Sequence, residues 1–294
     1  MNVKLALSLI LLVLAACAPK LKPDVEIAKD LENAKATFFA GEVKPAASKP
    51  CFAGAYYRKL VSSTDDWLGI EGVVVLPYIK FDENRKHPTK AMQYMDNPSV
   101  YFGGNMDEQE TDIGLTWEVI KDEKGNVTKD RRAFRPFLRR NEYKDGQPAV
   151  FENAPAKPEF YWYPGEEVKM SVKLVADKTL RFTVAGAGKK FERDFACNGF
   201  TLGGKAEYKR VNAIDQVGNE GRAVTDTKTQ VMNAVWKNTN LYRLVAKNTI
   251  VVPFHSGRYT EMMCPSPKFF KVKHSAQDLA TGAETLSISG NGEF

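Results

Sequence analysis

Several sequence signatures of common catalytic and binding sites are missing from this chain of 294 residues. It contains no GxGxxG or GK[ST] loop that would hold a phosphate group, and no GxSxG nucleophile elbow. Its four cysteines and three histidines lack the CxxC or Cys/His spacing of a zinc site. The formal net charge is only +6, and the stacking aromatics and motifs of nucleic-acid readers are missing. We therefore expect no cofactor, no metal and no nucleic-acid partner.

The apolar run near the N-terminus is too short to span a membrane as a helix. It extends from Leu5 to Leu14, about ten residues, whereas a membrane-spanning helix needs about 20. One positive charge, Lys4, precedes the run and small residues follow it. This pattern is typical of a secretory signal peptide.

The sequence Leu-Ala-Ala-Cys at residues 14–17 resembles the lipobox of bacterial lipoproteins. The resemblance implies that residues 1–16 are a signal peptide, cut off before Cys17. The thiol of Cys17 would then carry a diacylglycerol anchor with acyl chains such as palmitate, which places the protein in the bacterial cell envelope and makes the membrane its partner. Ala18 stands where some such lipoproteins have an Asp that retains them at the inner membrane. This favours the outer membrane if the source has two membranes.

Residues 17–50 are expected to be the lipid anchor and a tether. Prolines flank the segment Val25–Phe39, whose apolar residues repeat at helical spacing, so the pattern predicts a short amphipathic helix. A linker helix and a partner-binding helix both fit this pattern.

Lipidation of Cys17 would leave three cysteines, Cys51, Cys197 and Cys264. An exported compartment permits disulfides, but three cysteines cannot all pair. We expect one bridge and one buried thiol, and the sequence leaves open whether Cys197 pairs with Cys264 or with Cys51.

Residues 51–294 carry strand patterns with few helical interruptions. The clearest is a hairpin in which Val168–Leu174 and Leu180–Val184 alternate apolar and polar residues around a turn at Ala176–Lys178. Short strands without βα alternation predict an all-β sandwich of two sheets. The other expected strands are Ala55–Val61, Ile70–Leu76, Ser99–Phe102, Ile113–Ile120, Ala133–Arg139, Phe191–Phe195, Ala206–Ile214, Ala234–Ala246, Thr249–Phe254, Tyr259–Met263 and Glu284–Ser289.

The order of elements over residues 55–215 resembles that of concanavalin A-like sandwiches. The points of likeness are Ile70–Pro77, Asp112–Trp117, Phe160–Gly165 and Ala206–Tyr208. Legume lectins, laminarinase-type glucanases and glutamic peptidases share this jelly roll. The resemblance implies a concanavalin-like jelly-roll β-sandwich for residues 51–294, after the signal peptide and the short tether.

The catalytic residues of these enzymes are not reproduced. Glutamic peptidases have a catalytic Gln where this chain has Asp112, and a catalytic Glu where it has Val211 or Asn212. The departure argues against peptidase activity even if the fold is shared.

Glucanases of this kind place three carboxylates at alternate positions on one strand, as in E-x-D-x-E. Here Glu110 and Asp112 begin such a pattern, but Gly114 and Leu115 occupy the third place. Glu118 lies on the Asp112 face, yet six residues along an extended strand is about 20 Å. The pair is too far apart for hydrolysis by these two carboxylates alone.

The best candidate site is the polar face of the strand Ile113–Ile120. Asp112 and Glu118 share this face, and Arg135 and Arg139 from the next strand can point to the same side. Cross-strand salt bridges and a polar ligand groove both fit this arrangement.

Two tryptophans are candidates for stacking on sugar rings. Trp67 is expected to be accessible in the turn that begins at Asp65, and Trp162 near the start of the central hairpin. Our first functional hypothesis is therefore non-catalytic binding of a glycan or another envelope ligand by Trp67, Trp162, Asp112, Glu118, Arg135 and Arg139. The alternatives are a hydrolase of polysaccharide or peptidoglycan using Asp112 or Glu118, and a structural or assembly lipoprotein that binds an envelope protein.

Overall fold

The computed structural model describes residues 38–44, 51–129, 133–245 and 248–294. The expected signal peptide at residues 1–16, the lipidation site Cys17 and nearly all of the expected helix Val25–Phe39 lie outside these ranges. Within them, no helix is long and apolar enough to cross a membrane.

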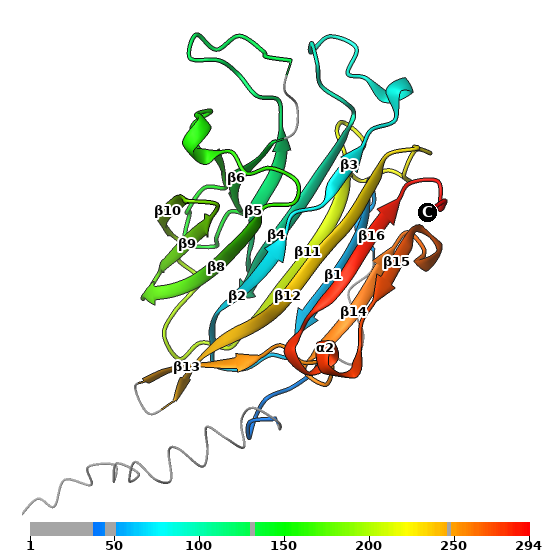
Figure 1. Ribbon diagram of the computed structural model, residues 1–294. Coiled ribbons are helices and arrows are strands. Elements are labelled where there is room, and N and C mark those ends of the chain that lie inside the picture. Colours follow the sequence, from blue (N-terminus) through cyan, green and yellow to red (C-terminus); the bar gives the residue numbers. More distant parts are fainter. Residues whose placement is uncertain (1–37, 45–50, 130–132, 246–247) are drawn as a thin grey trace, which may run out of the picture.

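One of the two sheets has seven strands, and every neighbouring pair in it is antiparallel (Figure 1). In spatial order its strands are β14 (Tyr259–Cys264), β1 (Ala55–Ser62), β11 (Ala206–Gln216), β4 (Asp96–Met106), β5 (Gln109–Glu118), β6 (Ala133–Arg140) and β7 (Val150–Asn153).

The other sheet has nine strands and is also antiparallel. Its main order is β10 (Lys189–Ala196), β9 (Thr179–Gly186), β8 (Glu167–Ala176), β2 (Trp67–Val75), β12 (Gln230–Val245), β16 (Glu284–Ser289) and β15 (Phe270–Lys273), while β13 (Asn248–Pro253) and β3 (Tyr78–Lys80) also pair with β12. In the described ranges there are also four short helical elements: η1 (Glu83–Arg85), η2 (Pro158–Phe160), η3 (Pro267–Phe269) and α2 (Ala276–Thr281).

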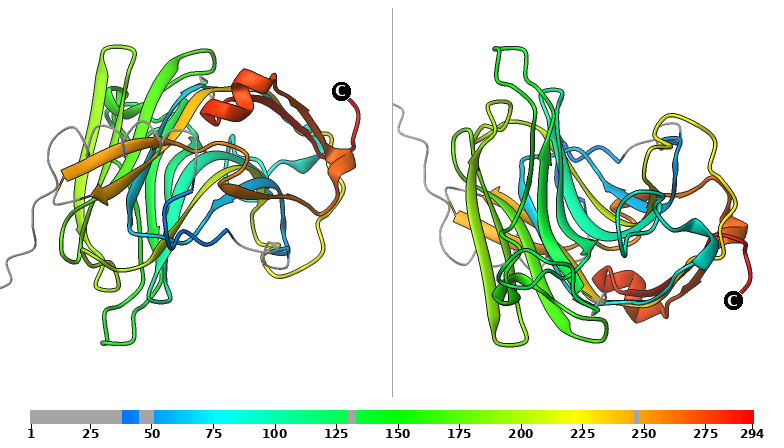
Figure 2. Two further views of the ribbon diagram at one scale, coloured as in Figure 1. Left: turned by 90° about the horizontal axis from the view of Figure 1, so that it is seen from below. Right: turned by 90° about the horizontal axis from the view of Figure 1, so that it is seen from above.

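The two sheets pack as the layers of a sandwich, and their strands are visibly curved (Figure 2). The expected all-β jelly-roll sandwich is therefore confirmed. The central hairpin is also confirmed: Val172 of β8 lies opposite Phe182 of β9, and the chain turns between Ala176 and Thr179.

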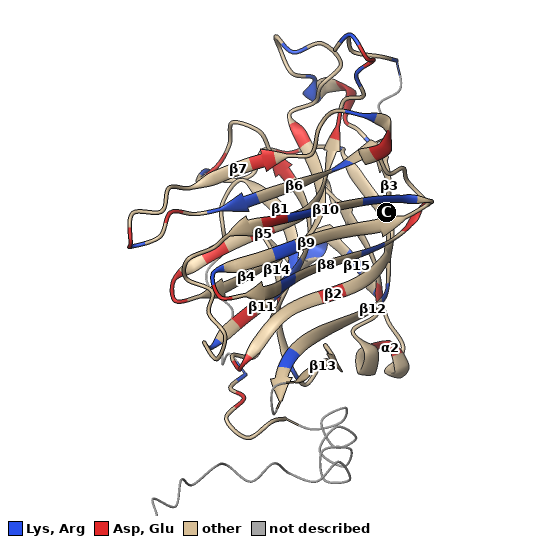
Figure 3. Cartoon of the chain, turned by 90° about the vertical axis from the view of Figure 1, so that its left-hand side faces the viewer, with Lys and Arg blue, Asp and Glu red and all other residues tan. Residues whose placement is uncertain are grey.

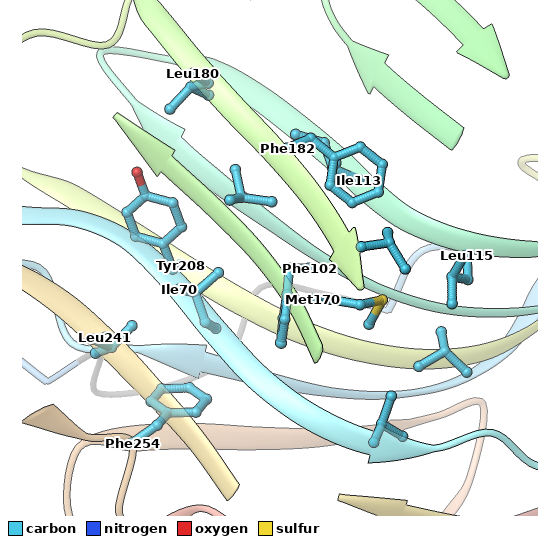
Figure 4. Packing of buried hydrophobic residues seen from close by; sticks show 14 of the residues in the cluster. Ile70, Phe102, Ile113, Leu115, Met170, Leu180, Phe182, Tyr208, Leu241 and Phe254 are labelled. Carbon is cyan, nitrogen blue, oxygen red and sulfur yellow. The ribbon is translucent and has the colours of Figure 1, made fainter. Parts of the chain in front are cut away.

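The interior is filled by the apolar side of each alternating strand (Figure 4). Ile113 and Leu115 of β5 are fully buried, whereas Asp112 and Thr116 are not. This period of two sends the polar side chains of β5 to the outer face of the seven-stranded sheet. Other core residues labelled in the figure are Ile70, Phe102, Met170, Leu180, Phe182, Tyr208, Leu241 and Phe254.

Part of the interior between the sheets is ionic. Glu284 of β16 accepts from Arg58 of β1, with an ion-pair distance of 2.8 Å, and pairs with Arg210 of β11 at 2.6 Å. All three side chains are almost completely buried. The network links β1 and β11 of one sheet to β16 of the other. Removal of any one of the three side chains would leave a buried charge without its partner, which is strongly destabilising.

A disulfide joins Cys51 to Cys264, and Cys197 is a free, buried thiol. The expectation of one bridge and one buried thiol is confirmed, but both pairings considered for Cys197 are wrong. Cys197 instead donates to the side-chain oxygen of Gln109 in the core, at 3.2 Å. The bridge joins Cys51 to Cys264, the last residue of β14.

Candidate functional site

The outer face of the seven-stranded sheet carries the candidate site, which we call the polar face. Its first transverse row runs from β11 to β7 through directly paired residues: Lys209, Gly103, Asp112, Arg139 and Phe151. Residues of both charge signs lie on these strands (Figure 3). The alternation of β5 and β6 thus places Asp112 and Arg139 side by side, as the sequence predicted.

Lys209 reaches across Gly103 to bind two carboxylates on β5. Its ammonium group lies 2.6 Å from Asp112 and 2.5 Å from Glu110. A Cβ atom on Gly103 would lie 2.6 Å from the Lys209 side chain, so the glycine provides the path. Burial disfavours the charge on Lys209, but the two carboxylates more than compensate and raise its pKa. Lys209 is therefore a cation held between Asp112 of its own row and Glu110 further along β5.

Arg139 and Phe151 are the accessible members of this row. The Arg139 side chain is exposed, and no carboxylate of the described chain forms an ion pair with it. Phe151, directly opposite on the edge strand β7, is 66% exposed. An unpaired guanidinium beside an exposed ring offers both a charged donor and an apolar platform to a ligand.

A second row follows, in which Tyr101 and Phe137 flank Gly114. The two rings meet edge to face with centroids 5.7 Å apart. Burial, together with the charges of Asp112, Asp215 and Glu110, raises the pKa of Tyr101 well above its usual value. The Tyr101 hydroxyl thus stays protonated and lies among carboxylates.

The rows beyond are occupied by cross-strand pairs. Arg135 of β6 pairs with Glu118 of β5, and the Thr116 hydroxyl donates to Asn97 at 3.1 Å. Arg135 and Glu118 therefore form an ion pair with each other, which is the salt-bridge alternative drawn from the sequence. The unpaired charge on the polar face comes from Arg139.

Asp215 of β11 is a carboxyl group that sequence reasoning missed. It accepts a hydrogen bond of 2.8 Å from the Ser99 hydroxyl. Burial, and to a smaller extent the charges of Asp112 and Glu220, raise the pKa of Asp215 to about 6, although the Ser99 bond and Arg139 act the other way. The alternation within β11 was the available indicator, because it places Lys209 and Asp215 on one face.

The two tryptophans expected to stack on sugars are not on this face, and the expectation that they are accessible is wrong. Both indoles are completely buried. Trp67 donates to the Ser63 carbonyl at 2.8 Å and packs against Phe39. Trp162 donates to the Gly186 carbonyl at 3.1 Å. Each indole N–H is thus satisfied inside the protein, so neither ring can meet a ligand.

A hollow of about 130 Å³ lies beside the polar face, where β6 and β7 meet β10. Phe137 belongs to the polar face and also lines the hollow, and the remaining apolar lining comes from Pro136, Leu138, Ala154, Pro155 and Phe191.

No group of three or more His, Cys, Asp or Glu in the described ranges is arranged to hold a metal ion.

Val211 and Asn212, the two positions considered for a catalytic Glu, lie on opposite faces of the sheet. Val211 of β11 lies on the outer face beside Tyr101. Asn212 points inward and accepts from the indole of Trp236 at 2.8 Å. Neither offers a carboxylate to Asp112.

No protein-family model and no curated protein matched the chain. Among solved structures, Scytalido-glutamic peptidase with a peptide-based transition-state analog is 10% identical, with a TM-score of 0.48, covering 80% of this chain and 98% of that one. A GH16 protein of Bacteroides ovatus in complex with a glucan product is 13% identical, with a TM-score of 0.32 and coverage of 65% and 84%. LamAcat from Zobellia galactanivorans is 11% identical, with a TM-score of 0.33 and coverage of 65% and 80%. At this level the likeness concerns the sandwich fold alone.

Proposed function

We propose that this protein is a lipid-anchored protein of the bacterial cell envelope that binds a glycan on its polar face without cleaving it. The anchor rests on the lipobox-like sequence that ends at Cys17. The binding role rests on one observation: exposed, unpaired Arg139 lies between ion-paired Asp112 and exposed Phe151.

This row supplies what a saccharide requires. A sugar ring has an apolar face that can stack on Phe151, and hydroxyl or carboxylate groups that can accept hydrogen bonds from Arg139. The carboxylate of Asp112 in the same row provides an acceptor, and the Tyr101 hydroxyl in the next row provides a further donor. Because Lys209 and the sheet hold Asp112 in place, little side-chain entropy is lost when a ligand binds there.

The alternative is a hydrolase of polysaccharide or peptidoglycan, and one observation favours it. Asp112 is ion-paired with Lys209, whereas burial raises the pKa of Asp215 to about 6, so the two carboxyl groups lie in different environments and Asp215 keeps its proton to a higher pH than an ordinary carboxyl group. Such a difference is what general acid and base roles require. In this hydrolase Asp215 would take the acid/base role first considered for Glu118, because Glu118 is ion-paired with Arg135.

A glycan array tests the binding role. The protein would consist of residues 38–294, because the side chain of Glu42 is buried in the body. Wild type is compared with Arg139→Ala and with a control, Arg181→Ala, which removes a half-exposed arginine from the other sheet.

The proposal predicts glycan signals that Arg139→Ala loses and Arg181→Ala retains. If both variants keep the wild-type signals, the glycan site does not include Arg139. If wild type gives no signal at all, the assembly role is favoured. Each bound glycan is then incubated with the protein. An intact glycan supports binding alone, whereas cleavage that disappears in Asp215→Asn supports the hydrolase.

A further inference from the structure

One end of the sandwich carries a concentration of exposed apolar side chains. Of the ten large hydrophobic residues that are exposed in the described chain, five lie there: Phe38 (47%), Val43 (63%), Val175 (39%), Leu202 (49%) and Val251 (46%). We call this surface the apolar end. In Figure 1 it is the lower end, where β13 and the first described residues are found.

Short contacts join the segments that form the apolar end. Val43 forms a bridge with Thr64 in the turn between β1 and β2. The backbone amide of Leu202 donates to Asp177, next to Val175, at 2.6 Å. Val251 lies on β13, where its neighbour Ile250 pairs with Arg243 of β12. Four separate stretches of chain therefore contribute apolar groups to one surface.

The segment 38–44 fixes the place at which the N-terminal region joins the body. The carboxylate of Glu42 pairs with Arg258 at 2.7 Å, and both side chains are fully buried. Phe39 lies beneath the guanidinium of Arg243, whose central carbon is 4.0 Å from the ring centroid. This segment therefore belongs to the packed body and not to the expected tether of residues 17–50. The chain enters the body at the apolar end.

The position of this entry point relates the apolar end to the anchor. Cys17 precedes Phe38 by 21 positions in the sequence, so a fully extended chain between them would reach about 70 Å. A lipid on Cys17 would hold the apolar end at a high local concentration beside the bilayer. Exposed Lys44 and Lys178 add positive charge that anionic headgroups attract.

We propose that the apolar end lies on the bilayer surface to which the chain is anchored, with Leu202 and Val251 in contact with the lipid. This inference rests on the lipid anchor of the proposed function. Isolated exposed hydrophobic residues are ordinary, but a cluster at the point where a membrane tether enters fits interfacial contact. The polar face would then stand on the side of the sandwich and remain open to envelope ligands.

The test uses the full chain, produced as a lipoprotein and reconstituted in vesicles of phosphatidylethanolamine and phosphatidylglycerol. Single cysteines are introduced as Leu202→Cys and Val251→Cys, and as Val127→Cys at a loop away from the apolar end. Each is labelled with a fluorophore that lipids with brominated acyl chains quench. The native thiols do not interfere, because Cys51 and Cys264 are bridged and Cys197 is buried.

The expected result is several-fold stronger quenching at residues 202 and 251 than at residue 127. Flotation with the vesicles is measured on the same samples. A protein that floats but shows equal quenching at all three positions refutes the contact and leaves the anchor intact. A protein that does not float refutes the anchor and the contact together. Labels at residues 202 and 251 that are shielded from water without bromolipid quenching would show that protein covers this end, which also overturns the proposal.

Discussion

The carboxylate of Glu42 and the guanidinium of Arg258 form a completely buried ion pair, although 216 positions separate them in the sequence. Glu42 also accepts from the Ser63 hydroxyl at 2.5 Å and from the backbone amide of Phe39 at 3.0 Å. Its two oxygens are therefore fully used, as a buried carboxylate requires. The pair ties the N-terminal end of the body to the loop before β14.

Glu42→Gln should lower the free energy of unfolding by about 3 kcal/mol, because it leaves the Arg258 charge buried without a partner. Urea denaturation of residues 38–294 measures the change. The control is Asp194→Asn, whose partner Arg181 is largely exposed, so the loss should stay below about 1 kcal/mol. Equal effects of the two variants would contradict the buried pair.

The disulfide between Cys51 and Cys264 should stabilise the native state by about 2–4 kcal/mol, since it closes a long loop in the unfolded chain. Replacing both cysteines by serine should reduce the free energy of unfolding by this amount in urea denaturation. Mass spectrometry of a non-reduced digest identifies the bridge directly. A peptide linking Cys197 to either partner would contradict the structure.

Cys197 should resist alkylation in the native protein. Burial raises the pKa of its thiol to about 12, so very little thiolate exists at pH 8, and the sulfur is inaccessible. Iodoacetamide should modify no cysteine of native residues 38–294 and one after unfolding without reductant. Modification of Cys197 at the same rate before and after unfolding would show that the thiol is accessible.

Asp215 should make stability depend on pH. Its pKa is about 6 in the folded protein and about 3.8 when unfolded, so the native state binds the extra proton between these values. The contribution of Asp215 to the free energy of unfolding should therefore fall as pH rises from about 4 to about 6, by up to about 3 kcal/mol in total. Asp215→Asn should abolish this decline.

Ser99→Ala is the matched variant for Asp215. It removes the hydrogen bond that favours the ionised carboxylate, so the pKa of Asp215 should rise and the decline in stability should extend to higher pH. Denaturation at a series of pH values, compared among wild type and the two variants, checks both changes. An unchanged pH profile in Asp215→Asn would mean that another group titrates.

The fold could be predicted where strands alternate cleanly. The β8–β9 hairpin was predicted nearly to its ends, and the alternation of Ile113 and Leu115 with Asp112 placed the polar face correctly. Such patterns suffice because one face of each strand must be buried. The strand β7 was missed because its four residues lie in a Pro-containing loop, and with it the exposed ring of Phe151.

The errors concern contacts between distant parts of the chain. Trp67 follows two aspartates in a polar turn, yet it is buried because Phe39 and Arg258 pack around it. The pairing of β12 with β2 also shifts register between Trp236 and Asn238, opposite Val74 and Val73. Gly72 is needed because a Cβ atom there would lie 2.8 Å from the Asn238 carbonyl oxygen. The residues next to Trp67 and Gly72 in the sequence do not reveal these neighbours, which come from distant parts of the chain.

The measurement that tests the central claim most directly is a titration of residues 38–294 with the strongest glycan found on the array. Isothermal calorimetry would compare wild type with Phe151→Ala and with Val251→Ala, two exposed apolar residues on different surfaces. Removal of a stacking ring costs about 1–2 kcal/mol, so Phe151→Ala should weaken binding roughly tenfold. Val251→Ala should leave the affinity unchanged. Wild-type affinity in Phe151→Ala, or equal losses in both variants, would contradict the assignment of the glycan site to the polar face.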